Sequence, residues 1–224
     1  MADLVIAGGT EALCRMTYTG FNALQALAQE PCRPFDKNRK GLTLGEAAGV
    51  LVLEDRERAM ARSATIIGEV LGSGLSCDAN HPTAPHPEGR GARQALESAL
   101  ASARLDPRDL GYVNAHGTGT PQNDVCESRA LNAVFGSAPS LPPVSSTKGL
   151  LGHTLAAAGA IEAVITLIGL RGGFAPPTLG LTDPDPDCEL DLVQGEARPI
   201  SYDIAASNSY GFGGNNCSLI FARP

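Results

Sequence analysis

Short, almost uniformly apolar runs alternate along this chain with longer stretches in which apolar residues recur every three or four positions. The short runs predict strands, and the helically spaced stretches predict helices. Strands are predicted at residues 3–8, 47–55, 65–76, 110–115, 142–147, 188–195, 203–209 and 215–221. Helices are predicted at residues 20–29, 55–62, 91–105, 123–135 and 152–171. Strands separated by helices of this length indicate an α/β protein whose sheets are covered on both faces.

Composition and charge narrow the class of protein. The chain has 224 residues, of which 43% are hydrophobic and 18% charged, as is typical of a soluble globular protein. Its net charge of −7 argues against general nucleic-acid binding, because no basic excess offsets phosphate repulsion. The longest apolar stretch, residues 160–170, contains Glu162 and predicts no membrane span. Residues 1–10 lack the pattern of a signal peptide, so we expect a cytoplasmic protein.

The cysteines suggest neither a metal site nor a disulfide framework. They are scattered, with no C-x-x-C pair and no histidine at metal-ligand spacing. The pattern predicts reduced thiols, as in the cytoplasm, and no metal. The six positions are Cys14, Cys32, Cys77, Cys126, Cys188 and Cys217.

Three loops contain residues of the types that take part in catalysis or ligand binding. Each of these loops lies between a predicted strand and the next element. In open α/β folds, ligands bind at the carboxyl ends of strands. Taken singly, the loops have ordinary explanations: a hydrogen-bonded structural histidine, a solvated lysine and a tight glycine hairpin. The residues are His116, Thr118 and Thr120 in the first loop, Lys148 and His153 in the second, and Gly211, Phe212, Gly213 and Gly214 in the third.

Taken together and in order, the three loops form a pattern that is specific for one protein family. The segments "NAHGTGTP", "SSTKGLLGHTLAAAGAIEA" and "NSYGFGGNN", in this order, resemble elongating β-ketoacyl-acyl-carrier-protein synthases of the thiolase superfamily. The resemblance extends over essentially the whole chain, including "VIAGGTEA" and "PPTLGLTDPDPDCELDLV". It implies a layered α-β-α-β-α fold. This chain would supply the C-terminal half, residues 65–224, and the end of the N-terminal half, residues 1–64.

The resemblance also implies roles for the catalytic residues. His116 and His153 match the pair that holds the thioester carbonyl of a malonyl unit. Lys148 matches a lysine that orients the site, and Glu162 matches its carboxylate partner. The two are fourteen positions apart, so their contact requires the chain to fold back. A helix beginning near residue 152 would lower the pKa of His153 through its positive end, which favours a neutral donor.

The remaining motif residues match the substrate-binding part of the family. Thr118 and Thr120 match hydroxyls that bind the phosphopantetheine arm of acyl carrier protein, and no cofactor of the chain's own is implied. Phe212 matches a residue whose backbone N–H completes an oxyanion hole and whose ring gates the acyl pocket. The glycines around it, which let the loop move, are Gly211, Gly213 and Gly214.

The family nucleophile, a cysteine in a small-residue turn, has no match among the six cysteines. We therefore expect a fragment or subunit of a synthase for decarboxylative Claisen condensation in fatty-acid or polyketide elongation. An N-terminal half-synthase polypeptide would carry the cysteine, acyl carrier protein would deliver substrate, and a two-fold axis would double the assembly. A truncated longer synthase makes the same chemical predictions. The alternative is a non-catalytic partner resembling a chain-length factor.

Two further features bear on assembly. The apolar segments 4–9 and 48–54 predict strands buried on both faces, which a half-synthase alone would leave open to water. The stretch "KNRKGLT" replaces a commonly acidic family segment and, with the preceding arginine, creates a local basic cluster. This cluster either helps an acidic carrier protein to dock or is a solvated charged turn. Its members are Arg33, Lys37, Arg39 and Lys40.

Overall fold

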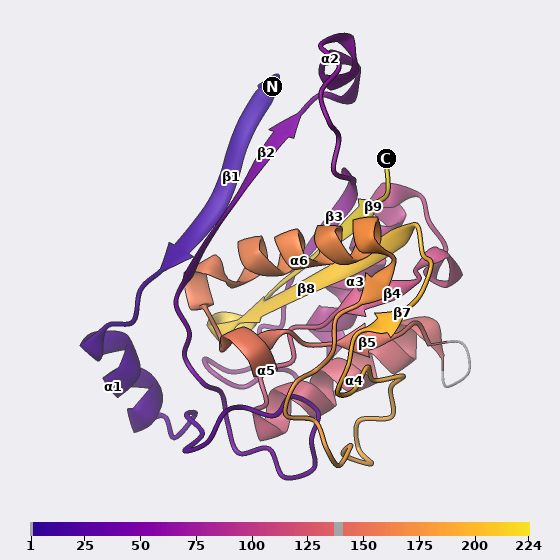
Figure 1. The fold of residues 1–224 in the computed structure, drawn as a ribbon. Helices are drawn as coiled ribbons and strands as arrows, with labels where there is room; N and C mark the ends of the chain where they lie inside the picture. Colours follow the sequence, from indigo (N-terminus) through magenta and orange to yellow (C-terminus); the bar gives the residue numbers. More distant parts are fainter. Residues whose placement is uncertain (1, 137–140) are drawn as a thin grey trace.

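The computed structural model describes residues 2–136 and 141–224, and at its centre is a five-stranded mixed sheet (Figure 1). The strand order is β3-β9-β8-β4-β5. β8, β4 and β5 run parallel, whereas β9 is antiparallel to both β3 and β8. The predicted α/β class is confirmed. The sheet strands are β3 (Glu69–Cys77), β4 (Tyr112–Asn114), β5 (Val144–Ser145), β8 (Ile204–Gly211) and β9 (Asn215–Ala222).

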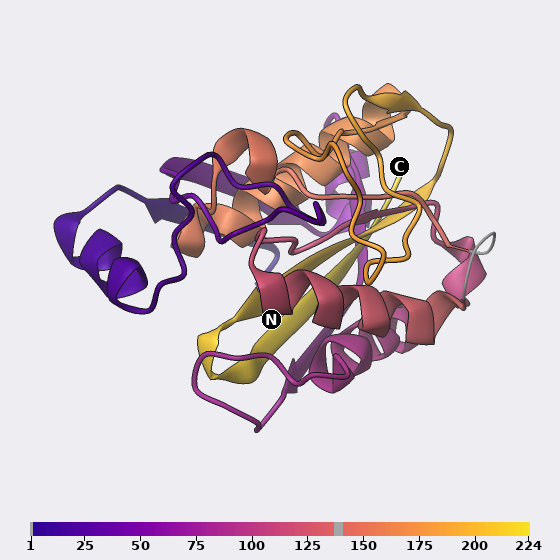
Figure 2. The same ribbon diagram turned by 90° about the horizontal axis from the view of Figure 1, so that it is seen from below.

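Helices cover both faces of this sheet (Figure 2). α6 (Ala158–Gly172) lies on one face, and α3 (Arg90–Ala103) and α4 (Pro121–Phe135) lie on the other. Successive strand residues point to opposite sides, so neighbours in one strand belong to different core clusters. The α6 side is packed around Tyr112, Ala163, Leu167, Leu170, Ala205 and Phe221. The α3 and α4 side is packed around Leu96, Leu100, Val113, Leu131, Ala206 and Ile220.

An antiparallel ladder of β1 (Leu4–Glu11) and β2 (Ala47–Glu54) extends away from the central sheet (Figure 1). The ladder packs on α6 and on the short helix η2 (Leu155–Ala157). Its other side is uncovered: Ile6, Val50 and Val52 share one face and are 71%, 61% and 62% exposed. This exposure agrees with the expectation that a half-synthase alone leaves these strands open to water, and their burial on both faces in a complete assembly stays a prediction. The division of the chain at residues 64 and 65 stays a prediction.

The other elements are short. They are α1 (Arg15–Ala23), α2 (Arg56–Ala61), α5 (Lys148–Leu151), the 3-10 turns η1 (Pro107–Asp109) and η3 (Phe212–Gly214), and the paired strands β6 (Phe174–Ala175) and β7 (Arg198–Pro199).

Three predicted elements differ clearly from the structure in position or type. The helix predicted at residues 20–29 ends earlier, because Gln25 adopts a left-handed backbone conformation (φ 54°). It also begins earlier, since Cys14 accepts a hydrogen bond from the backbone of Thr17 and caps the first turn of α1. Residues 188–195 form no strand, and Leu192 contributes only an isolated bridge to β5.

The helix predicted at residues 152–171 starts only at Ala158. Gly152 (φ 72°) and Leu155 (φ 43°) adopt left-handed conformations that a continuous helix cannot contain. In the described part of the chain, one segment, Leu155–Gly172, is apolar and long enough to cross a membrane by length and composition, contrary to the sequence-based expectation. This segment is η2 and α6. α6 packs against the central sheet and η2 packs against the β1–β2 ladder, and a core helix passes the same test.

Candidate active site

The three loops with candidate chemistry meet at one edge of the central sheet. β4 and β5 are parallel neighbours, so the loops that follow Asn114 and Ser145 emerge on the same side. β8 is also parallel to β4, and its last residue, Gly211, leads into η3 at that edge. Strand direction therefore brings together segments that are far apart in the sequence.

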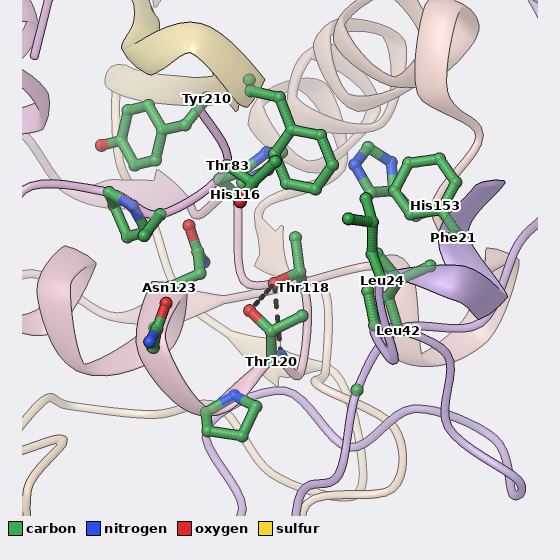
Figure 3. Close-up of a pocket in the computed structure, with 18 of the residues that line it drawn as sticks. Phe21, Leu24, Leu42, Thr83, His116, Thr118, Thr120, Asn123, His153 and Tyr210 are labelled. Carbon is green, nitrogen blue, oxygen red and sulfur yellow. Dashed lines mark hydrogen bonds between the residues drawn. The ribbon is translucent and has the colours of Figure 1, made fainter. Parts of the chain in front are cut away.

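A cavity of about 630 Å³ lies between these loops (Figure 3). His116 and His153 both line it, with ring centroids 5.2 Å apart and ring planes at 81°. Lys148, Glu162 and Gly213 lie behind or beside the lining and do not form part of it. The predicted site residues that line the cavity are His116, Thr118, Thr120, His153, Gly211, Phe212 and Gly214.

Both histidines offer the Nε2 nitrogen as a hydrogen-bond donor. The backbone N–H of Leu155 donates to Nδ1 of His153 at 3.2 Å. Nδ1 of His116 lies 3.4 Å from Nζ of Lys148, and an ammonium group can only donate. A neutral imidazole whose Nδ1 accepts carries its proton on Nε2. Each ring in the cavity wall therefore has one N–H for a ligand.

Burial keeps both rings neutral. It lowers the pKa of His116 well below its ordinary value, and the nearby Lys148 and His153 add to this shift. Burial also lowers the pKa of His153 to about 3, with the positive charge of Lys148 as the second cause. The expectation that a helix terminus produces this shift is wrong, because α6 begins only at Ala158. The expected neutral state of His153 nevertheless holds at neutral pH.

A buried ion pair holds His116 from behind. Lys148 in α5 is 2% exposed, and Glu162 in α6 is similarly buried. Nζ of Lys148 contacts the carboxylate of Glu162 and donates to the carbonyl oxygen of His116 at 2.6 Å. The contact expected across fourteen positions is present, because the chain turns back between α5 and α6 at Gly152.

Glu127 in α4 is a further buried carboxylate, and no motif singles it out in the sequence. Its two oxygens accept hydrogen bonds from the backbone N–H groups of His116 and Gly117, each at 2.8 Å. Burial raises the pKa of Glu127 to about 7. Asp124, one turn earlier in α4, accepts from the backbone N–H of Gly119 at 3.2 Å. These carboxylates hold the loop that carries His116. Acidic residues one turn apart in the helix after that loop are the available sequence signal.

The remaining cavity wall combines hydroxyls with a glycine-supported aromatic ring. The hydroxyls of Thr118 and Thr120 hydrogen-bond to each other at 2.8 Å and lie below His116 in Figure 3. The ring of Phe212 is at the exposed edge of the cavity, and its centroid is 5.6 Å from that of Phe21 in α1. After Phe212 the backbone enters the left-handed region at two successive glycines, with φ values of 83° and 79°.

Two family models match this chain. The β-ketoacyl synthase C-terminal domain matches residues 67–182, and the β-ketoacyl synthase N-terminal domain matches residues 1–59. The chain belongs to the β-ketoacyl synthase family. The resemblance seen in the sequence motifs and the thiolase-like character of the fold are thereby confirmed.

Individual β-ketoacyl synthases are similar over nearly the whole chain. The 3-oxoacyl-[acyl-carrier-protein] synthase 2 of Synechocystis sp. is 46% identical, and that of Staphylococcus aureus is 44% identical; each match covers 99% of this chain and 55% of the relative. Among solved structures, the ishigamide ketosynthase/chain length factor has a TM-score of 0.95 at 42% identity, covering 99% of this chain and 54% of that one. A β-ketoacyl synthase from Burkholderia phymatum has a TM-score of 0.95 at 43% identity, covering 99% and 55%. The chain spans about half the length of the curated relatives it matches.

None of the six cysteines of this β-ketoacyl synthase chain, all of which are described, lines the cavity. Cys32 is buried, and its thiol donates to the carbonyl oxygen of Lys148 at 3.1 Å. Burial raises the pKa values of Cys126 and Cys188 to about 11, which disfavours the nucleophilic thiolate. Within residues 2–136 and 141–224, no group of three or more His, Cys, Asp or Glu side chains could hold a metal ion.

The basic cluster expected at the surface is divided by the fold. Arg39 is buried, and its guanidinium pairs with Asp185 and donates to the carbonyl oxygens of Thr120 and Pro121 at 3.2 and 2.9 Å. The prediction of a surface role is therefore wrong for Arg39, which joins its loop to the start of α4. The members that stay at least partly accessible are Arg33, Lys37 and Lys40.

Proposed function

We propose that this chain forms the condensing part of the active site of an elongating β-ketoacyl-acyl-carrier-protein synthase. The observation that carries the proposal is the pair of neutral histidines, His116 and His153, which line one cavity with Nε2–H groups to donate. Donors held in a water-poor site stabilise an oxygen on which negative charge develops. The carbonyl oxygen of a thioester that becomes an enolate is such an oxygen.

The proposed reaction is a decarboxylative Claisen condensation. The bond between the carboxylate and the α-carbon of a malonyl thioester breaks, carbon dioxide leaves, and the electron pair forms an enolate. Its oxygen accepts hydrogen bonds from His116 and His153. The enolate carbon then attacks an acyl group held on a cysteine as a thioester, a carbon–carbon bond forms, and the thiolate leaves. The backbone N–H of Phe212 stabilises the oxyanion of this second step.

Acyl carrier protein delivers the malonyl unit on its phosphopantetheine arm in this proposal. The hydroxyls of Thr118 and Thr120, which line the cavity next to His116, bind the arm. The ring of Phe212 gates the acyl pocket, and the flanking glycines allow its loop to move. Lys148 and Glu162 do not line the cavity, so we assign them the positioning of His116.

The nucleophilic cysteine comes, in this proposal, from an N-terminal half-synthase, as a separate polypeptide or as the remainder of a longer chain. Two observations support it: the chain spans about half of its relatives, and the outer face of the β1–β2 ladder is apolar and uncovered. An exposed apolar face of this kind favours association. A complete assembly would place the cysteine opposite His116 and His153, would be doubled by a two-fold axis, and would act in the cytoplasm without nucleic acid.

The first test asks whether the chain can form an acyl-enzyme alone. Intact-mass spectrometry after incubation with acyl carrier protein thioester or acyl-CoA should show no stoichiometric acylation, because no thiol lies in the cavity. In the assembly with an N-terminal half, His116→Ala and His153→Ala should each slow malonyl decarboxylation about a hundredfold or more. His81→Ala, in an exposed histidine outside the cavity, is the matched control.

Two outcomes would contradict the proposal. Specific acylation of one of the chain's own cysteines would show that no other cysteine is needed. Near-normal decarboxylation in both histidine variants would instead identify the chain as a structural partner resembling a chain-length factor, which shapes a pocket without performing chemistry.

A further inference from the structure

Lys40 is a cation at the cavity that the proposed reaction leaves unused. Lys40 is exposed and lines the same cavity as Thr118 and Thr120. It also lines a neighbouring cavity with Glu30, whose carboxylate pairs with Arg33 at 3.1 Å. Among the residues that line the cavity with Thr118 and Thr120, all of them described, Lys40 is the only Lys or Arg. None of the ion pairs found in the described residues includes it.

The backbone on both sides of Lys40 is fixed to the threonine loop. Before it, the buried guanidinium of Arg39 donates to the carbonyl oxygens of Thr120 and Pro121. After it, the backbone N–H of Gly41 donates to the carbonyl oxygen of Gly119 at 3.0 Å. The side chain of Lys40 therefore starts from a defined place next to the threonine hydroxyls, although its own end is in solvent.

No described residue that lines the cavity with Thr118 and Thr120 forms an ion pair with Lys40. The lining residues contributed by the start of α4 are neutral: Pro121, Gln122 and Asn123. The acidic residue in the lining, Asp78, is buried and already accepts hydrogen bonds from the side chain of Asn216 at 2.9 Å and the backbone of His86 at 2.8 Å. In a chain of net charge −7, an unpaired ammonium in a cavity wall is suited to an anionic ligand.

We propose that Lys40 binds the phosphate of the phosphopantetheine arm, an inference that rests on the proposed function. The arm carries the thioester at one end and a phosphodiester at the other. With the thioester carbonyl at His116 and His153 and the arm along Thr118 and Thr120, the far end of the arm would leave the cavity past the wall that contains Lys40. An ammonium–phosphate contact is a charge-assisted hydrogen bond, which is stronger than a neutral one.

The experiment compares substrates with and without the phosphate, using the chain assembled with its N-terminal half. Malonyl-phosphopantetheine, malonyl-pantetheine and malonyl-carrier protein are the substrates, and decarboxylation gives KM and kcat. Lys40→Met keeps most of the side-chain volume and removes the charge, Lys40→Arg restores a cation, and Lys37→Met is the control. Lys37 is an exposed lysine of the same loop that does not line the cavity.

Lys40→Met should raise KM about tenfold for the two phosphate-containing substrates, the usual size for a hydrogen bond to a charged group. Its KM for malonyl-pantetheine and its kcat should be unchanged. Lys40→Arg should retain most of the affinity. Lys37→Met should have the wild-type KM for malonyl-phosphopantetheine and for malonyl-pantetheine, the two substrates without carrier protein. An increase only with malonyl-carrier protein would assign Lys40 to the protein surface of the carrier and overturn the proposal.

Two further results would also overturn it: an equal increase in KM with and without phosphate, or no change at all. In both cases normal decarboxylation by the wild type would leave the proposed function standing. Calorimetric titration with unacylated phosphopantetheine and pantetheine needs no turnover. The titration therefore tests Lys40 even if the assembly decarboxylates none of the malonyl substrates. Absence of decarboxylation would reject the proposed function but would not by itself decide the role of Lys40.

Discussion

Replacing Lys148 with methionine tests whether this lysine stabilises the fold, positions His116, or does both. Nζ of Lys148 contacts the Glu162 carboxylate and donates to the carbonyl oxygen of His116 at 2.6 Å. The second carboxylate oxygen of Glu162 has no described hydrogen-bond partner. Lys148→Met therefore leaves a buried carboxylate without a cation and a buried carbonyl without its donor.

The burial of both groups sets the expected magnitudes. Breaking a buried ion pair from one side costs about 3–5 kcal/mol, so we expect this loss in Lys148→Met and again in Glu162→Leu. Replacing both charges with apolar side chains of similar volume is often close to neutral. The double variant should lose only about 1–3 kcal/mol, the cost of leaving the carbonyl of His116 unpaired. The singles together would cost about 6–10 kcal/mol, which implies a coupling of at least about 3 kcal/mol.

Urea unfolding followed by circular dichroism, on the assembled enzyme, measures the four free energies of the cycle. Malonyl decarboxylation is measured on the same proteins. The double variant should recover most of the lost stability but not the turnover, because nothing then holds His116. The control cycle uses Arg93 and Glu97, an exposed pair in α3 at 2.7 Å, for which coupling should stay below about 1 kcal/mol.

Additive losses in the double variant would refute the reasoning about the buried pair, since they would show that the two charges do not depend on each other. Recovery of turnover together with stability would refute the positioning role of Lys148. A coupling in the exposed Arg93–Glu97 pair as large as that in the buried pair would show that burial is not what sets the magnitude.

Two other predictions concern pH and assembly. The pKa of His153 is about 3 in the folded chain. Below about pH 6.5 the unfolded chain therefore takes up a proton at His153 that the folded chain does not. As pH falls from about 6.5 toward 3, this proton uptake lowers the free energy of unfolding by ~1.4 kcal/mol per pH unit. Urea unfolding at pH 6.5 and 5.5 should show a steeper loss for the wild type than for His153→Asn, and parallel losses would contradict the assignment. The isolated chain should self-associate and bind a hydrophobic dye through the β1–β2 ladder, and lysines in place of Ile6, Val50 and Val52 should reduce both effects in size-exclusion chromatography and dye fluorescence. A sharp monomeric peak with no dye binding for the unmodified chain would contradict this expectation.

The sequence by itself determined the class of the fold and the loops that carry the site. Alternating apolar runs and helical stretches predicted α/β architecture, because side-chain periodicity reports which positions face a core. The amphipathic pattern at residues 91–105 predicts a helix that the structure places at Arg90–Ala103. His116 and His153 stand out because their motifs recur in a known order. Each of these signals lies within a short stretch of the chain. It can therefore be recognised without knowing which distant residues pack against that stretch.

Only the tertiary structure decided how distant segments support the site. Glu127 holds the backbone at His116, and Phe21 in α1 meets Phe212 across almost the whole length of the chain. Arg39 belongs to the basic stretch predicted at the surface but is buried in the structure. Its guanidinium is held inside by carbonyl oxygens at the start of α4 and by the carboxylate of Asp185. The neutral state of His153 comes from burial and Lys148, whereas the helix assumed from the sequence begins too late to produce it. A charge and its environment are properties of three-dimensional neighbours, and a one-dimensional pattern records only neighbours along the chain.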